Sequence, residues 1–363
     1  MDGERAPARD RGAPALAVLE PAPLVMVSVH RAGRGGGADE VWLSPGGQGV
    51  WVARMAAEMG AAPRVCAPVG GRPGSVLPAL VAAEGIELVG VECPAPSAVW
   101  VSTGRDGDEA DVAHTASPRL DRHEADRLYN VALAAGLEAG LAVLTGLADP
   151  GILPRGFYAR LTRDLRENGV TVVADVSPPL IDAVAGAGVS VLKASHEELV
   201  AARLAATDGR DELISAVGGL REAGARAVLV SRRAEPALAH TGRALLEIVH
   251  PRLEELNPRG AGDAMTGALA AALARGEPIE AAMRVAVAAG CLNVTRRGLG
   301  TGERRATAAM AEGLRSRRPV AAGPPGRGKR GTGSAGRCLL STGWSGTWCW
   351  RRAAAPTSAR RSW

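Results

Sequence analysis

Aromatic residues are scarce in this chain of 363 residues, which holds one Phe and two Tyr. Since 46% of the residues are nevertheless hydrophobic and 22% are charged, the composition is that of a globular protein whose core is built from Ala, Val and Leu. No apolar run approaches the roughly 18 residues that a membrane span requires. We therefore predict a folded protein without a membrane-spanning segment.

Cysteines are few and irregularly spaced. They lie at Cys66, Cys93, Cys291, Cys338 and Cys349. An odd, dispersed set in a chain of this length is typical of reduced thiols and argues against a disulfide framework or a zinc site. Residues 1–23 contain no apolar stretch before a small-residue cleavage site, so we expect no secretion and predict a cytoplasmic location.

The net charge of +5 is unevenly distributed. From Ser316 onward there are ten Lys or Arg and no Asp or Glu, so the preceding residues carry a net charge of −5. Nucleic-acid binding requires basic residues on a folded surface, and we expect no such partner. We interpret residues 316–363 as a disordered basic tail, with an interaction segment or an extension read in a non-ancestral frame as alternatives. Residues 1–23 are predicted to be a disordered N-terminal extension.

Short apolar runs alternate with helical patterns over some 250 residues. Candidate strands are Leu24–Val29, Arg64–Val69, Leu141–Thr145, Val170–Asp175, Val189–Lys193 and Ala227–Ser231. Candidate helices are Gln48–Met59, Arg122–Leu137, Pro154–Asn168, His196–Ala206 and Glu212–Ala223. This alternation predicts a mostly parallel sheet with helices on both faces, whose ligands bind at the carboxyl ends of the strands.

A glycine-rich turn before a helix carries the strongest chemical signal. Gly260, Ala261 and Gly262 bring backbone N–H groups to the start of a helix, where they have no partner within the helix and the helix dipole favours an anion. Asp263 follows in the first turn. An anion hole beside a carboxylate suits transfer of a phosphoryl group to a hydroxyl. The alternative is that Asp263 only caps an Ala-rich helix.

A second glycine-rich turn, Gly46-Gly47-Gln48-Gly49, precedes another helix some 200 residues earlier. The two turns in this order resemble the two signatures of the PfkB (ribokinase-like) family of sugar kinases, and within it the 1-phosphofructokinase and tagatose-6-phosphate kinase branch. The resemblance runs from about Leu24 to Arg315 and predicts a kinase domain over 24–315. It implies a three-layer α/β/α ribokinase-like fold with a mostly parallel central sheet and a small β lid.

Two stretches interrupt the alternation with short strands. The expected short strands are Val41–Leu43, Ala98–Thr103 and Ala110–Thr115. A polar Asp-Gly turn precedes the last of them. The resemblance implies a lid, within about 24–45 and 97–115, that covers the sugar and in several members forms a homodimer contact. An edge hairpin without a role is the alternative.

The resemblance also implies roles for individual residues. Asp263 would be the catalytic base and Gly260, Ala261 and Gly262 the anion hole. The nucleotide and its Mg²⁺ would be bound by Lys193, Ser195, Glu198, Ser231 and Asn257, with Glu198 reaching the metal through water. Ser195 stands where the family has Asn, and Arg232-Arg233-Ala234-Glu235 replaces a Gly-x-x-Gly loop. The alternatives are a solvated helix-start acid at Glu198, a surface lysine at Lys193 and a turn residue at Asn257.

The sugar side departs further from the family pattern. The resemblance assigns Gly46, Gly47, Gln48 and Gly49 to the sugar, with Gln48 in place of Lys and Trp51 in place of Asn. An Asp expected after the first strand has no counterpart in His30–Gly33, and a lid arginine is missing near Pro96–Ser97. Arg31, Arg34 or Arg54 could supply the missing cations. An aspartate base of ordinary pKa, about 3.9, would act mainly by positioning the acceptor.

These features predict an ATP- and Mg²⁺-dependent kinase that phosphorylates a hydroxyl of a sugar or sugar phosphate, with no nucleic-acid or membrane partner. One alternative is a catalytically impaired homologue that binds sugar or nucleotide for a regulatory purpose, motivated by the altered loops. The other is a nucleoside kinase of the same fold.

Overall fold

The computed structural model describes residues 12–30, 38–105, 108–146, 151–296 and 298–319. Its main element is a ten-stranded sheet in the order β14-β13-β12-β11-β10-β9-β8-β1-β4-β5, parallel from β5 to β11 and antiparallel beyond. The strands are β1 (Ala15–Leu19), β4 (Ala62–Gly70), β5 (Glu87–Cys93), β8 (Leu141–Thr145), β9 (Thr171–Asp175), β10 (Val191–Ser195), β11 (Val228–Arg232), β12 (Glu235–His240), β13 (Leu245–Val249) and β14 (Arg315–Arg317).

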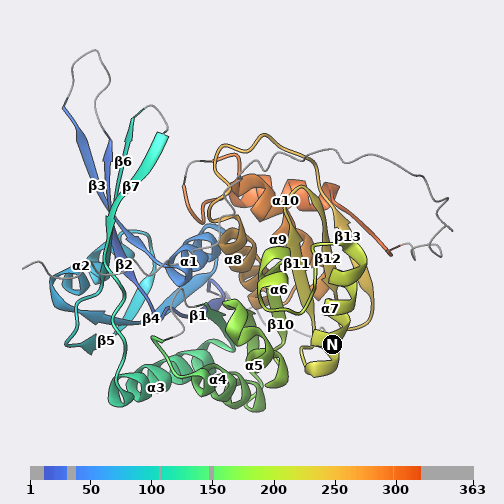
Figure 1. Cartoon of the computed structure of the whole chain (residues 1–363), viewed down its shortest axis with the longest axis horizontal. Coiled ribbons are helices and arrows are strands. Elements are labelled where there is room, and N and C mark those ends of the chain that lie inside the picture. The colour runs from blue at the N-terminus through green and yellow to red at the C-terminus, as the bar shows by residue number, and fades with distance from the viewer. Residues whose placement is uncertain (1–11, 31–37, 106–107, 147–150, 297, 320–363) are drawn as a thin grey trace, which may run out of the picture.

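Helices cover both faces of this sheet (Figure 1). One face packs against α1 (Gln48–Glu58), α8 (Ala261–Ala274), α9 (Ile279–Asn293) and α10 (Arg304–Gly313). The other packs against α3 (Arg122–Ala139), α4 (Arg155–Glu167), α5 (Ile181–Gly186) and α7 (Arg210–Ala223). The remaining helices are α2 (Gly71–Ala82), the 3₁₀ turn η1 (Pro178–Leu180) and α6 (His196–Ala201). The predicted three-layer α/β/α fold is confirmed, and no helix in the described ranges is long and apolar enough to cross a bilayer.

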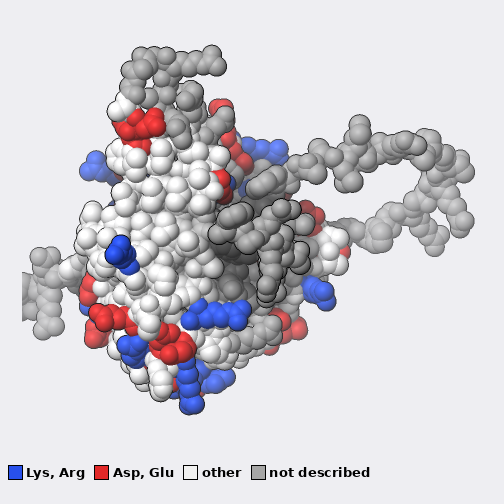
Figure 2. Space-filling view, turned by 60° about the vertical axis from the view of Figure 1, so that its left-hand side comes forward, with Lys and Arg blue, Asp and Glu red and all other residues white. Residues whose placement is uncertain are grey.

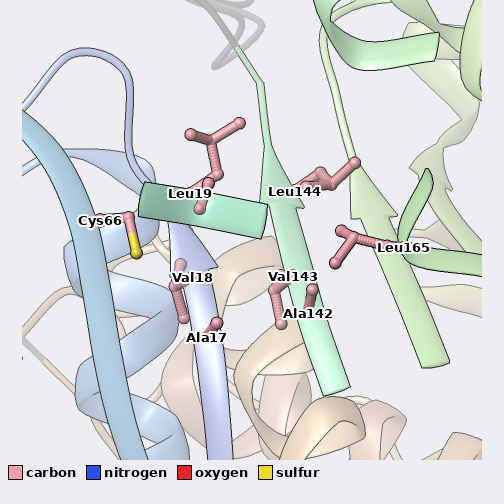
Figure 3. Close-up of a pocket in the computed structure, with 9 residues that line it drawn as sticks. Ala17, Val18, Leu19, Cys66, Ala142, Val143, Leu144 and Leu165 are labelled. Carbon is pink, nitrogen blue, oxygen red and sulfur yellow. The ribbon is translucent and has the colours of Figure 1, made fainter. Parts of the chain in front are cut away.

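The central strand β1 corrects the N-terminal boundary. Residues 1–23 were expected to be a disordered extension, but Ala15–Leu19 pairs with β4 on one side and β8 on the other, and Leu16 to Leu19 are buried. Figure 3 shows this strand beside β8, with Leu165 reaching in from α4, around a packing gap that leaves no room for a water molecule. A five-residue strand that is buried on both faces does not alternate polar and apolar residues. The sequence therefore gives little sign that a strand lies there.

The C-terminal boundary also shifts slightly. The tail was expected to start at residue 316, but β14 (Arg315–Arg317) extends the sheet. Arg317 is held by Glu247 at 2.9 Å, and Glu247, 3% exposed, also pairs with Arg210 at 2.6 Å. Residues 320–363 of the predicted tail lie outside the described residues, as do residues 1–11.

A second sheet forms the lid. Its four strands run in the order β3-β2-β6-β7 and comprise β2 (Leu24–His30), β3 (Glu40–Gly46), β6 (Ala98–Arg105) and β7 (Asp108–His114). The strand expected at Leu24–Val29 is thus β2 of the lid and not a central strand. Figure 1 shows these strands projecting beyond the body above α1.

Helices α1 and α8 lie against each other with almost no space between their backbones. A Cβ atom added at Gly267 of α8 would lie 2.4 Å from the carbonyl oxygen of Val52 in α1. Such an approach admits only glycine. The contact fixes the relative position of the two helices that follow the glycine-rich turns.

Candidate active site

The Gly260–Asp263 turn is held in place by its neighbours. Gly260 has a φ of 78° and precedes α8, and a side chain there would meet the backbone nitrogen of Gly300 at 2.8 Å. Buried Asn293 donates from Nδ2 to the carbonyl of Arg259 at 2.9 Å and accepts from the N–H of Thr301 at 3.1 Å. The turn therefore presents its backbone in one defined conformation. Asn293 was missed, and its only signal is a lone amide near the end of an Ala-rich helix.

Three buried side chains from separate elements meet beneath this turn. Lys193 of β10 donates to Oδ2 of Asp175 at 3.0 Å, and Thr266 of α8 donates to the same oxygen at 2.6 Å. Lys193 also lies under Gly262, since an added Cβ there would be 2.7 Å from Nζ. Burial lowers the pKa of Lys193, but attraction to Asp175 and the neighbouring carboxylates outweighs it and raises the pKa overall. The alternative of a surface lysine is wrong, because Lys193 is only 4% exposed.

Asp263 stands in the first turn of α8 among like charges. Its pKa is raised from an ordinary 3.8 to about 7, mainly because burial disfavours the charged form and secondly because Asp175 repels it, with Glu198 and Glu20 adding to the effect. This differs from the ordinary aspartate pKa assumed from the sequence. A carboxylate with a pKa near neutrality is a better proton acceptor for an alcohol than a free aspartate.

Ser195 and Glu198 form a capping box at the start of α6. The backbone N–H of Ser195 donates to Glu198 Oε2 at 2.7 Å, and the N–H of Glu198 donates to Ser195 Oγ at 3.1 Å. Burial raises the pKa of Glu198. Both side chains thus have a local structural role at the carboxyl end of β10, whatever else they bind.

The other nucleotide-side residues lie next to this cap. Ser231 pairs in register with Ser195, and its carbonyl lies 3.3 Å from His196 Nδ1. Arg233, in the loop that replaces Gly-x-x-Gly, adopts a φ of 50° and pairs with Glu197 at 2.6 Å. Its guanidinium is therefore already engaged.

Asn257 opens the turn that leads to α8. Its Oδ1 accepts from the N–H of Arg259 at 3.0 Å. The interpretation of Asn257 as a turn residue therefore has direct geometric support.

The Gly46–Gly49 turn forms hydrogen bonds with residues from other parts of the chain. The amide of Gln48 donates to the carbonyl of Asp175 at 3.3 Å and accepts from the N–H of Gly146 at 2.8 Å. Glu20 accepts from the N–H of Gly49 at 2.5 Å and from the N–H of Ala22 at 2.7 Å. Gln48 therefore bridges the ends of β8 and β9.

Glu20 also corrects the expectation that no carboxylate follows the first strand. The comparison with His30–Gly33 started from the wrong strand, because the first central strand is β1 and Glu20 comes directly after it. Glu20 is 1% exposed, and burial raises its pKa to about 7. The signal that could have revealed it is the acid that ends the apolar run 15–19.

Of the three cations proposed to compensate on the sugar side, only Arg54 lies in the described part of the chain. Arg54 pairs with Glu84 at 2.6 Å and donates to the carbonyl of Leu299 at 2.7 Å. Arg31 and Arg34 lie outside the described residues. Arg259 is exposed and lies 5.9 Å from the ring centroid of Trp100 in the lid.

Comparison with known proteins shows the family to which the chain belongs. The model of the pfkB family of carbohydrate kinases matches residues 24–305. The chain belongs to this family. It is therefore a phosphotransferase that acts on a carbohydrate hydroxyl, and sugar kinases of this family use ATP.

Curated relatives carry phosphofructokinase names. The chain is 26% identical over 259 residues to 1-phosphofructokinase of Bacillus subtilis (strain 168), covering 71% of this chain and 84% of the relative. It is 26% identical over 253 residues to the ATP-dependent 6-phosphofructokinase isozyme 2 of Escherichia coli (strain K12), covering 68% and 81%. These names are consistent with the branch predicted from the two turns.

Solved structures share the fold. Phosphofructokinase-2 from Escherichia coli in complex with potassium superposes with a TM-score of 0.71 at 23% identity, covering 82% of this chain and 98% of that one. A carbohydrate kinase from Agrobacterium tumefaciens gives a TM-score of 0.62 at 21% identity, covering 82% and 97%.

Proposed function

We propose that this kinase transfers the γ-phosphoryl group of ATP to a carbohydrate hydroxyl with Asp263 as the catalytic base. The acceptor oxygen forms a bond to the γ-phosphorus, the bond to the bridging oxygen of ADP breaks, and the hydroxyl proton passes to Asp263. The N–H groups of the first turn of α8 stabilise charge on the transferring group, because they have no acceptor within the helix. The supporting observation is the place of Asp263 in the first turn of α8 beside these donors, where burial raises its pKa to about 7.

Mg²⁺ fits the carboxylates below the turn. Asp175 Oδ1 is buried and has no hydrogen-bond partner, and Glu198 lies close enough to influence the charge of both Lys193 and Asp263. The described chain holds no group of three side chains spaced as direct metal ligands. We therefore assign Asp175 and Glu198 to the metal through water, in keeping with the preference of Mg²⁺ to retain its waters. The bound metal would neutralise phosphate charge.

The remaining assignments follow from position. Lys193 would contribute positive charge beneath the phosphates, and Ser231 and Asn257 would border the nucleotide. Gly46, Gly47, Gln48 and Gly49 would form the floor of the acceptor site through backbone and bridging contacts rather than through a free Gln48 amide.

The test is ADP formation with hexoses, pentoses, hexose phosphates and nucleosides in the presence and absence of Mg²⁺. We expect turnover on a carbohydrate that is lost with chelator and in the Asp263→Asn variant. Equal turnover by that variant would remove Asp263 as the base. Calorimetric binding of sugar or nucleotide without turnover on any acceptor would favour the regulatory alternative.

We also propose a homodimer formed through the lid. Val41, Trp42, Leu43 and Val112 of the lid strands are between 55% and 60% exposed. Figure 2 shows that the side on which the lid lies carries few charged side chains over a broad area. An exposed apolar patch of this kind marks an interaction surface. Analytical ultracentrifugation should give a dimer that Trp42→Ser weakens, and a monomeric wild-type protein at micromolar concentration would contradict it.

A further inference from the structure

Arg54 of α1 links three separate parts of the chain through one guanidinium group. Its Nε and Nη2 donate to the two carboxylate oxygens of Glu84 at 2.8 and 2.6 Å, in the forked geometry that strengthens an arginine–carboxylate pair. Nη1 donates to the carbonyl of Leu299 at 2.7 Å, and Nη2 also donates to the carbonyl of Pro45 at 3.3 Å. Four hydrogen bonds therefore hold this side chain, which is only 18% exposed.

The two carbonyl groups belong to segments that adjoin the two glycine-rich turns. Pro45 directly precedes Gly46, the first residue of the turn before α1. Leu299 lies against the turn before α8, since a Cβ added at Gly260 would be 3.0 Å from its Cα and 2.8 Å from the nitrogen of Gly300. One guanidinium group thus contacts the backbone beside both turns.

The segment that contains Leu299 is closely packed between α1 and the turn before α8. A Cβ added at Gly300 would lie 2.3 Å from the carbonyl oxygen of Trp51 in α1. The N–H of Thr301 donates at 3.1 Å to Asn293, whose side chain also holds the turn before α8. A displacement of the guanidinium group would therefore act on both turns.

We propose that Arg54 is a positioning residue, which fixes the two turns relative to each other and thereby aligns the acceptor hydroxyl with the transferring phosphoryl group. The inference rests on the proposed function, in which one turn lies under the acceptor and the other binds the transferring group. Arg54 touches neither substrate in this arrangement and acts through the backbone at Pro45 and Leu299. Because a misplacement of about 1 Å can reduce a rate about 10²-fold, its loss should appear mainly in kcat.

The first test compares Arg54→Lys with Arg275→Lys. Lysine keeps the charge but lacks the planar fork, so it cannot bind Glu84 and both carbonyl groups at once. Arg275 is a matched control, since it is 21% exposed, pairs with Glu277 at 2.8 Å and donates at 2.8 Å to the carbonyl of Met59, at the opposite end of α1. It contacts neither turn through these bonds.

The rates are measured with the fastest acceptor found among hexoses, pentoses and hexose phosphates. We expect kcat to fall about 10–10²-fold in Arg54→Lys and less than about threefold in Arg275→Lys. The dissociation constant of a non-hydrolysable ATP analogue should stay unchanged in both variants, because each turn remains intact by itself. Equal losses of kcat in the two variants would overturn the inference.

Amide hydrogen exchange tests the link between the turns without any acceptor. Peptides that contain residues 45–49 and 259–263 should both exchange about tenfold faster in Arg54→Lys than in the wild-type protein. Neither peptide should change in Arg275→Lys. Faster exchange at one turn alone, or at neither, would show that Arg54 does not hold the two turns together.

Glu84→Gln supplies a second variant if Arg54→Lys fails to fold. Glu84 borders a surface cavity of about 530 Å³, so water can replace part of its contact with Arg54. The bonds to both carbonyl groups remain possible, and kcat should therefore stay within about threefold of wild type, although the ion pair is lost. A loss of about 10²-fold in Glu84→Gln would contradict the role given to the carbonyl contacts.

Asp263→Asn, measured with the same acceptor, separates this inference from the proposed function. Full activity in Asp263→Asn together with a loss in Arg54→Lys would count against the proposed base alone. A loss in Asp263→Asn together with full activity in Arg54→Lys would overturn the positioning role alone. If no acceptor yields ADP, the exchange rates of the two turns still decide whether Arg54 links them.

Discussion

The two glycine-rich turns look alike in sequence but are used differently in the folded chain. Both precede helices, α8 and α1, that pack against each other and begin near Asp175, which contacts Thr266 of α8 and Gln48 of α1. At α8 the carboxylate of the turn, Asp263, stands beside the first backbone amides. At α1 a carboxylate from another strand, Glu20, accepts from them.

The difference teaches that a glycine-rich turn marks a close approach but does not say which group approaches. At Gly262 the close group is the buried Lys193, and at Gly47 it is Glu20. In the proposed function the α8 end serves phosphoryl transfer, whereas the α1 end is built around an internal carboxylate. The predictions below test this contrast.

The largest effect is expected at the α8 end. Asp263→Asn keeps the shape of the side chain, but the amide cannot take the proton from the carbohydrate hydroxyl. We therefore expect kcat to fall by about 10²–10⁴-fold. The dissociation constant of a non-hydrolysable ATP analogue, measured by calorimetry, should change little. Asp182→Asn, which alters an exposed acid on α5, is the matched control. Retained turnover in Asp263→Asn would mean that the carboxylate of the α8 turn is not the catalytic base.

Removal of the buried cation should affect stability strongly. Lys193→Met leaves Asp175 as an unpaired buried charge, which should lower the free energy of unfolding by about 3–5 kcal/mol in urea titrations. Arg64 pairs with Glu87 and Glu138 at the surface, so Arg64→Met should cost at most about 1 kcal/mol. Similar losses in the two variants would contradict the view that the site beneath α8 is a desolvated ion pair.

The pH dependence of kcat/KM should follow the protonation of Asp263. Because the base must be unprotonated and its pKa is about 7, kcat/KM should fall about tenfold for each pH unit below 7. A plateau extending down to pH 5 would contradict this assignment.

Stability should respond to pH in the opposite direction. The folded pKa of Asp263 lies above its unfolded value, so its contribution to stability is complete at low pH and is lost as the pH rises through about 7. The difference in melting temperature between Asp263→Asn and the wild-type protein should therefore increase from pH 5 to pH 8. A constant difference over this range would exclude the raised pKa.

Local patterns predicted much of the fold. The strand at Leu141–Thr145 is found with the expected ends, and Glu212–Ala223 falls within α7. The helix after Gly260–Asp263 is also present. These elements are bounded by glycines and have the lengths typical of a strand and of helices, so short-range rules suffice for them.

The sequence did not reveal residues whose role depends on partners far away along the chain. β1 lacks alternation because both its faces are buried, and its omission concealed Glu20. Asp175 was recognised only as the end of a strand, although it binds Lys193 and Thr266, 18 and 91 residues away. Asn293 fixes the turn before α8 from across the helix pair. No local pattern indicates which distant side chains will share a buried carboxylate.

The smallest effect is expected at Ser195, where the cap and the metal-site interpretations can be separated. Ser195→Ala removes the side-chain acceptor for the N–H of Glu198 and should lower the free energy of unfolding by about 1 kcal/mol. Ser195→Asn retains a good N-cap, so its stability should remain within about 0.5 kcal/mol of wild type. If Ser195 also borders the metal waters, the added amide should change the Mg²⁺ concentration that gives half-maximal rate in Ser195→Asn, although its unfolding curve is unchanged. An unchanged Mg²⁺ dependence in both variants would limit Ser195 to its capping role and leave Asp175 and Glu198 as the groups that face the metal.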